Sequence, residues 1–226
     1  ISACLVGSEM CIRDRDSGNT GSATLNKNVT TYDATIKHSG NYSAKLQSQY
    51  VALFGIGAFA AGNVFVGKFL KIDGTDGILR FGRPFTSRPS KLVLYYRYVA
   101  GTVDYSTLSE LPKNSKDMGS IYIALGDWPH QTFEGETDIP VLVKTKPADR
   151  QLFDSNSSNV IGYGECILKE STEGEGLIKL EIPINYRSNR KPTDIILVGS
   201  ASRYGDYFTG STGSTLWLDD LELIYE

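Results

Sequence analysis

The chain has 226 residues, with 23 basic and 26 acidic side chains and a formal net charge of −3. This balance gives no global positive field and argues against a nucleic-acid partner. No apolar run approaches the roughly 18 residues of a membrane span. The 13 tyrosines and 23 glycines, beside only two methionines, favour strands separated by turns over helices.

The first fifteen residues show no hydrophobic period. The run from Leu5 to Arg15 matches one reading frame of a widely used transposase sequencing adapter. We therefore interpret residues 1–15 as a foreign, artefactual segment and exclude them from the fold. Cys4 and Cys11 lie inside this segment, which leaves Cys166 as the cysteine expected to be native and removes any argument for a disulfide. Residues 16–226 are predicted to form a single domain.

Segments rich in β-branched and aromatic residues, bounded by turn residues, predict strands along the whole remaining chain. A series of this length favours a two-sheet jelly-roll β-sandwich with antiparallel sheets. Both faces of the segment 91–99 are largely apolar or aromatic, so it is expected to be central. The stretch 51–63 is open between a packed loop and a short helix, and 73–77 reads as a tight turn. The predicted strands are Val29–Ile36, Tyr42–Gln47, Val64–Leu70, Lys91–Val99, Ser120–Leu125, Pro140–Thr145, Val160–Lys169, Leu177–Ile184, Asp194–Ala201 and Thr215–Tyr225.

The last of these strands changes phase in its middle. Leu216 and Leu218 share one face, but Leu221 continues in the opposite phase, so the alternation slips at Asp219 and Asp220. A β-bulge is the simplest cause. If the later phase faces the core, Asp219 is buried and needs a cation or several hydrogen-bond donors. A structural Ca²⁺ is one candidate.

Two aromatic segments are candidate sugar-binding elements. Trp128 follows a strand that ends at Leu125, so its indole is expected on a loop at the sandwich edge, where it can stack on a sugar ring while Asp127 and Arg88 bind hydroxyl groups. The alternative is that Trp128 covers the core. The second segment is a loop that combines aromatic, acidic and basic side chains, and a structural role is its alternative. Its candidate binding residues are Tyr204, Asp206 and Tyr207.

Signals for catalysis are weaker. His38 and His130 lack partners at metal-ligand or triad spacing, and no glycine-rich loop has the form of a P-loop. Glycosidases use two carboxyl groups about 5 to 10 Å apart. With 26 acidic residues the sequence does not select a pair, although five acids are candidates: Asp127, Glu165, Asp206, Asp219 and Asp220.

Ordered blocks after residue 40 resemble one family, the carbohydrate-metabolism domain family PCMD. The resemblance implies a jelly-roll sandwich similar to carbohydrate-binding modules and galactose-binding-like domains, in a secreted, periplasmic or outer-surface protein of bacterial polysaccharide utilisation. Members of that family usually carry an additional N-terminal strand, which residues 16–226 are expected to lack, and often upstream immunoglobulin-like domains. Neighbouring surface proteins are the partners that the resemblance implies. The blocks are Gly62–Phe65, Gly67–Phe69, Gly82–Pro89, Ile121–Trp128, Tyr163–Glu165, Ile182–Ile184, Tyr186–Arg187, Ser200–Ser202, Tyr204–Gly210 and Leu216–Glu222.

A second resemblance concerns the metal. Ser39–Leu46 together with Leu218–Glu222 resembles the first and last strands of calcium-holding carbohydrate-binding modules. It implies Asp219 as a calcium ligand, with Asp220 as the alternative.

Three functions follow as hypotheses. The first is a non-catalytic module that binds an oligo- or polysaccharide. The second is a glycoside hydrolase that uses paired carboxyl groups on the same sandwich. The third is a structural or adhesin-like surface domain, which an exposed apolar patch without an aromatic-lined cleft favours.

Overall fold

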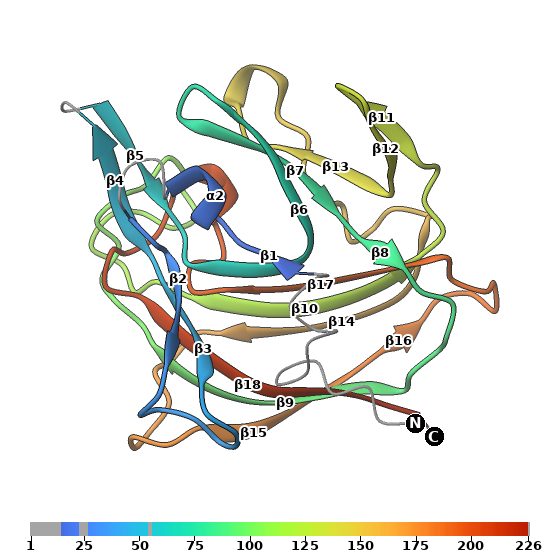
Figure 1. The fold of residues 1–226 in the computed structure, drawn as a ribbon. Coiled ribbons are helices and arrows are strands. Elements are labelled where there is room, and N and C mark those ends of the chain that lie inside the picture. The colour runs from blue at the N-terminus through green and yellow to red at the C-terminus, as the bar shows by residue number, and fades with distance from the viewer. Residues whose placement is uncertain (1–14, 23–26, 54–55, 226) are drawn as a thin grey trace.

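The computed structural model describes residues 15–22, 27–53 and 56–225. They form a β-sandwich of two antiparallel sheets, stacked one above the other in Figure 1. This confirms the predicted all-β class and the two-sheet sandwich.

The larger sheet contains, in spatial order, β13 (Val141–Lys144), β7 (Asp76–Phe81), β6 (Asn63–Asp73), β17 (Asp194–Ser200), β10 (Gly119–Gly126), β14 (Val160–Leu168) and β16 (Asn185–Tyr186). In addition, β1 (Arg15–Asp16) pairs with β6 and β8 (Arg83–Pro84) with β17. The smaller sheet has the order β15 (Ile178–Pro183), β9 (Lys91–Val99), β18 (Thr215–Ile224), β3 (Ser43–Gln47) and β2 (Thr30–Asp33).

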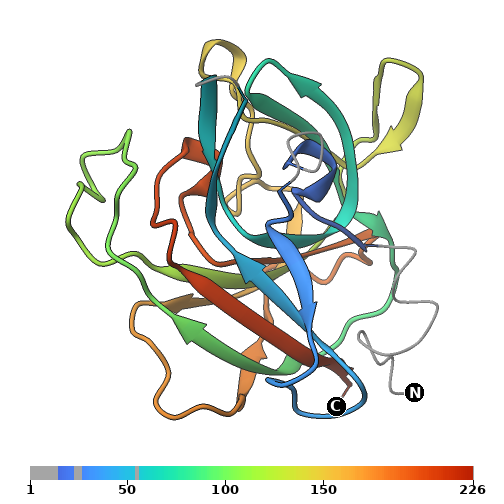
Figure 2. The same cartoon turned by 60° about the vertical axis from the view of Figure 1, so that its left-hand side comes forward.

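Two hairpins and three short helical segments complete the described part of the domain. The hairpin of β4 (Gln49–Leu53) and β5 (Ile56–Ala60) stands at the upper left of Figure 1, and that of β11 (Gln131–Phe133) and β12 (Glu136–Ile139) at the upper right. Figure 2 shows α2 (Asn19–Ser22) between the first hairpin and the curled strand β6. The 3₁₀ turns are η2 (Pro147–Asp149) and η3 (Gly205–Tyr207). Within the described ranges, no helix is long and apolar enough to span a membrane.

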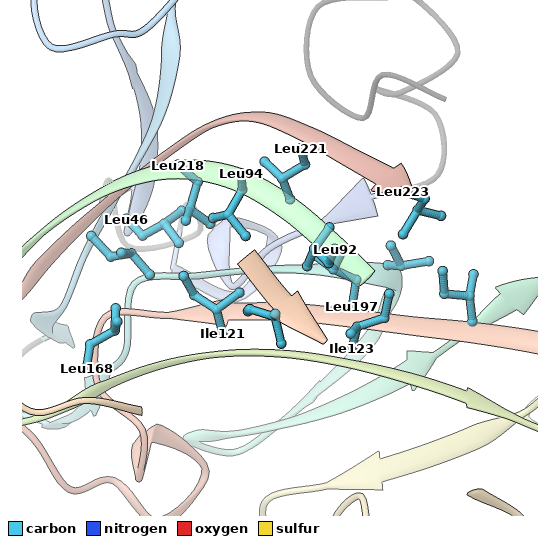
Figure 3. Packing of buried hydrophobic residues seen from close by; sticks show 14 of the residues in the cluster. Leu46, Leu92, Leu94, Ile121, Ile123, Leu168, Leu197, Leu218, Leu221 and Leu223 are labelled. Carbon is cyan, nitrogen blue, oxygen red and sulfur yellow. The ribbon is translucent and has the colours of Figure 1, made fainter. Parts of the chain in front are cut away.

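The main core lies between the two sheets. Alternate residues of β9 and β18 point into it, among them Leu92, Leu94 and Leu218, all at most 1% exposed. Ile121 and Ile123 of β10 face them from the larger sheet, as Figure 3 shows. The period of two along each strand places these side chains on one face, where burial removes them from water.

A second apolar cluster covers the opposite face of the larger sheet. Phe65 of β6, Ala124 of β10 and Ile196 of β17 pack there under residues of β7 and β13. The central strands β10 and β17 are therefore covered on both faces.

The strand β18 carries the predicted bulge. Its register against β9 shifts between Asp219 and Glu222, and Asp220 has φ +46°. Leu218 and Leu221, which lie on either side of the shift, are both buried in the main core. The bulge therefore explains how one strand keeps its apolar residues inside despite a broken alternation.

All ten predicted strands are present, and β9 matches its predicted bounds. The prediction for 51–63 is wrong, because the segment contains most of the β4–β5 hairpin and the start of β6. The tight turn at 73–77 is confirmed as the connection of β6 to β7, with Gly74 at φ +71°. Of the adapter-like residues 1–15, residues 1–14 lie outside the described residues, whereas Arg15 belongs to β1 and pairs with Val66 of β6, contrary to its exclusion from the fold.

A buried carboxylate fastens the long loop that precedes β18. Asp117 is 0% exposed, and its Oδ2 accepts hydrogen bonds from Ser202 Oγ (2.6 Å), Ser214 Oγ (2.7 Å) and the Ser211 amide (2.8 Å). Burial raises the pKa of Asp117, and these hydrogen bonds oppose that rise. One side chain from the segment before β10 thus holds both ends of the loop 202–214.

Replacing Asp117 with Ala should destabilise the fold by about 3 kcal/mol or more, because several buried donors lose their acceptor. Urea unfolding followed by circular dichroism measures the change. Asp104→Ala is the matched control, since Asp104 also accepts hydrogen bonds from this loop, at Thr212, but in an exposed position. We expect less than about 1 kcal/mol for the control. Equal unfolding midpoints for the two variants would contradict the assigned role of Asp117.

Candidate functional site

A cavity of about 480 Å³ lies where four distant parts of the chain meet. Its volume is within the range of small-molecule sites. The segments that line it are α2, the β4–β5 hairpin, the β6–β7 hairpin and the loop that contains η3. Figure 1 shows the first three around the upper left of the molecule. The main apolar lining residues are Val51, Phe59, Phe69, Ile72, Leu79 and Phe208.

Small residues let these segments approach one another and still leave space. A Cβ added to Gly205 would lie 2.3 Å from the Cβ of Ala61, so the η3 loop packs directly on the chain that links β5 to β6. A Cβ added to Gly21 of α2 would lie 3.2 Å from the ring of Phe69. Glycine and alanine make up much of the rest of the wall, which explains why it encloses volume instead of filling it.

Three polar side chains of the wall lack a full set of partners among the described residues. Asp206 lies in η3 and is half-buried. Asp76 Oδ1 and Ser22 Oγ are buried oxygens without a hydrogen-bond partner among the residues that the structure describes. By contrast, Thr145 Oγ1 already accepts the Gly77 amide at 2.9 Å, and Asn63 Oδ1 accepts the Gly18 amide at 2.8 Å.

Both carboxyl groups hold their proton more tightly than usual. Burial raises the pKa of Asp206 to about 6, and nearby Arg150 opposes the rise. Burial also raises the pKa of Asp76, assisted by Asp73 and opposed by the hydrogen bond from Thr75 and by Arg150. The charged form of each acid is therefore incompletely stabilised by the protein itself. Perturbed acids in a concave site are typical of functional positions.

The two tyrosines of the predicted binding loop, Tyr204 and Tyr207, lie beside this cavity and do not line it. The rings of Tyr204 and Tyr207 are 6.5 Å apart, edge to face, and both are half-buried. Arg203 lies 5.9 Å from the Tyr204 ring and Arg150 4.7 Å from the Tyr207 ring. Of the three candidates in this loop, Asp206 alone lies in the wall.

The other predicted sugar-binding group lies at the far end of β10. Trp128 is only 8% exposed and belongs to the second apolar cluster, with Phe153 6.2 Å from its ring. A Cβ on Gly126 would come within 2.5 Å of three indole atoms, so the ring rests directly on the strand end. The indole covers the core and offers no free ring face, contrary to the expected exposed platform.

The polar partners proposed for Trp128 are also engaged. Arg88 donates to the carbonyl groups of Arg190 (2.6 Å) and Ser188 (3.0 Å), and its guanidinium lies 4.0 Å from the Tyr186 ring. Asp127 accepts a 3.4 Å hydrogen bond from Arg190. These contacts hold the 187–190 turn in place. The 204–207 loop lies at the opposite end of β10, where the Arg203 amide donates to the Met118 carbonyl at 2.7 Å. The structure therefore does not unite Arg88, Asp127 and Trp128 with that loop.

The acids of the bulge have donors of their own. Asp219 is 1% exposed, and its carboxylate accepts the backbone amides of His38 (2.8 Å) and Ser39 (3.2 Å). Asp220 accepts Ser39 Oγ and lies 2.7 Å from His38 Nδ1. The predicted need of Asp219 for donors is thus met by backbone amides, whose N–H groups do not bind cations. This donor set does not fit Ca²⁺, and among the described residues no group of three His, Cys, Asp or Glu side chains is suitable for a metal. Calcium binding stays a prediction that these contacts do not support.

The remaining acids are distributed elsewhere. Glu165 pairs with Arg203, and neither lines the cavity. Asp206 is therefore the one member of the five candidate acids that does. Sequence reasoning missed Asp76 and Ser22 as site residues, because the recognised turn at 73–77 gave no sign of which segment it faces.

A second hollow, of about 510 Å³, lies on the outer face of the smaller sheet. Its charged side chains are largely paired with one another, for example Lys91 with Glu181 at 3.0 Å and Lys179 with Glu181 at 2.6 Å. Since these groups already satisfy one another, we take the first cavity as the candidate site.

Comparison with known proteins identifies the family. The profile described as "Putative carbohydrate metabolism domain" (PCMD) matches residues 7–224, and the chain belongs to this family. A search among curated proteins gave no match. The carbohydrate connection of the domain is thereby shown.

Two solved structures share the fold. Each is described as a "putative glycoside hydrolase" and covers 94% of this chain with a TM-score of 0.66. The protein from Bacteroides thetaiotaomicron is 22% identical, and the match spans 63% of its length. The protein from Bacteroides vulgatus is 24% identical, and the match spans 85% of its length. This chain therefore corresponds to less than two thirds of the first relative.

Replacing Trp128 with Ala should destabilise the fold by about 3 to 5 kcal/mol, as expected for removal of a buried aromatic ring. Chemical unfolding monitored by circular dichroism measures the loss. Tyr32→Ala is the control, because this ring is 73% exposed. A Trp128→Ala protein as stable as the control would show that the indole is not part of the core.

Replacing Asp206 with Asn should stabilise the fold at pH 7.5, and the gain should vanish near pH 4. The folded protein binds the proton of Asp206 more tightly than the unfolded chain, because the pKa rises from 3.8 to about 6. Its ionisation thus weakens the fold as pH rises through this window, and below it both states are protonated. Melting temperatures of both proteins at pH 4, 5, 6 and 7.5 test this. Asp138→Asn is the control for the effect of replacing a carboxylate with an amide, because the Asp138 side chain is 81% exposed. A gain for Asp206→Asn that is the same at every pH would refute the burial of this carboxyl.

Proposed function

We propose that this PCMD domain binds a saccharide in the cavity between α2, the β4–β5 hairpin, the β6–β7 hairpin and the η3 loop, without catalysing a reaction. The observation that supports this most is the combination, in one wall, of apolar rings with acceptor oxygens that the protein leaves unpaired. Membership of a carbohydrate-related family supplies the ligand class.

The chemistry of a sugar matches this wall. The C–H face of a pyranose packs on apolar and aromatic side chains, here including Phe59, Phe69 and Phe208. Its hydroxyl groups donate hydrogen bonds, and the carboxylates of Asp76 and Asp206 accept them. A buried acceptor that gains a donor no longer carries its desolvation penalty, so such bonds contribute to affinity.

Glycoside hydrolysis is the second candidate, and a specific observation favours it. Asp76 and Asp206 line one cavity, and burial raises the pKa of both. A carboxyl group with a pKa near 6 is suited to act as a general acid that protonates a leaving oxygen, while a second carboxylate acts as nucleophile or base. We rank hydrolysis below binding. Binding requires only that the two acids accept hydrogen bonds from hydroxyl groups, whereas hydrolysis sets further requirements on the pair.

The setting of the domain is also part of the proposal. We place it in a bacterial protein of polysaccharide utilisation outside the cytoplasm. The surface location, the upstream domains and the protein partners implied by the family resemblance stay predictions.

Filling the cavity should abolish saccharide binding. Ala58 lines the cavity, so Ala58→Trp replaces the space for a ligand with an indole. Glycan-array screening identifies ligands of the wild-type domain, and isothermal titration calorimetry then compares the variants. We expect no heat from Ala58→Trp at concentrations that saturate the wild type. The control is Ala148→Trp, at an exposed position outside the cavity, which should bind as the wild type does.

The same preparation separates binding from hydrolysis. If the wild type releases reducing sugar from the glycan that it binds, and Asp206→Asn abolishes release, the domain is a hydrolase and the non-catalytic proposal is wrong. If Ala58→Trp binds glycan with wild-type affinity while its melting temperature shows a folded protein, the saccharide site is not this cavity.

A further inference from the structure

The wall of the cavity carries negative charge without a cation. Among its described lining residues, two are acidic, Asp76 and Asp206, and none is Lys, Arg or His. Apolar groups and glycines surround the two acids. A carboxylate in such a place is poorly solvated, so its charge is best balanced by something that enters the cavity.

The cationic side chains near the two acids interact with groups outside the cavity wall. Arg150 Nε donates to the Thr145 carbonyl at 3.1 Å, and its guanidinium lies over the Tyr207 ring. Lys146 forms a 2.9 Å ion pair with Asp73. Both cations lie close enough to favour ionised Asp76, yet burial outweighs them. The protein therefore supplies only a partial counter-charge.

Two buried oxygens mark where donors are missing. Asp76 Oδ1 has no hydrogen-bond partner within the described part of the chain, although Thr75 reaches the other oxygen of the carboxylate at 3.4 Å. Ser22 is 4% exposed, and its Oγ is likewise unpaired there. Buried polar atoms are nearly always satisfied, so two orphans in one cavity wall point to a ligand that donates hydrogen bonds.

We infer that the cavity selects a sugar with a free, protonated amino group, a hexosamine unit, over neutral and acidic sugars. This rests on the proposed function and adds the ligand class. An ammonium group carries three donors and no acceptor, and its positive charge is complementary to the two carboxylates. Charge-assisted hydrogen bonds are about twice as strong as neutral ones. A uronic acid would bring a third carboxylate into the same space, which like-charge repulsion disfavours.

The test uses three β-1,4-linked trisaccharides, of glucosamine, N-acetylglucosamine and glucose, together with glucuronic acid. Titration calorimetry is carried out at pH 6.5, where a large part of the sugar amine is protonated. We expect the glucosamine trimer to bind at least about tenfold more tightly than the two neutral trimers, the difference that one additional charge-assisted hydrogen bond provides. Glucuronic acid should give no measurable binding.

Variants connect the preference to the two acids. Asp206→Asn and Asp76→Asn should each bring the affinity ratio of the glucosamine and glucose trimers close to one, whereas Asp138→Asn should leave it unchanged. Melting temperatures confirm that each variant is folded. A wild-type ratio near one, with both trimers bound, overturns the amino-sugar inference and leaves saccharide binding intact. A ratio that survives both cavity variants overturns it as well. If no member of a wider glycan panel binds, the proposed function itself fails.

Discussion

The buried carboxylate of Asp117 is the constraint on which the candidate site depends. It joins the segment before β10 to both ends of the loop 202–214, through hydroxyl and amide donors that have no access to water. Because the ends are fixed, η3 is placed against Ala61 and brings Asp206 into the cavity wall. Asp117, whose carboxylate has its hydrogen-bond donors within the protein, therefore positions Asp206, whose carboxylate lacks them among the described residues. This difference distinguishes a structural carboxylate from a functional candidate.

The cavity also depends on what its residues lack. The β4–β5 hairpin and the turns beside it contribute glycine and alanine where larger side chains would close the space. Packing of this kind reduces stability, since protein interiors otherwise pack with few voids. Leaving Asp76 Oδ1 and Ser22 Oγ without donors reduces it further. Such a loss of stability, concentrated at one connected place, is what a binding site requires, whereas the leucine-rich layers of the sandwich core pack against each other from both sheets.

The sequence predicted the sandwich well, because period-two patterns are local and most of its strands carry them. The phase change at Asp219 even located the bulge of β18. The β4–β5 hairpin was missed because its Ala and Gly residues give no alternation. The exposure of Trp128 could not be read either, since Phe153, which packs against the ring, lies 25 positions further along the chain (153 − 128). The geometry of the site depends on such contacts between residues far apart in the sequence, and no local sequence pattern encodes them.

Asp206 illustrates why composition alone could not select the site. Five acids fitted the glycosidase hypothesis equally well on the sequence, and the structure distinguishes them by their partners. Glu165 and Asp127 lie beside arginines, and Asp219 accepts backbone amides, so each already has partners within the protein. Asp206 lies in a largely apolar wall, where burial raises its pKa and nearby Arg150 only partly opposes the rise. A carboxylate that the fold does not neutralise attracts donors from solution, and under the proposed function those donors are the hydroxyl and amino groups of a sugar.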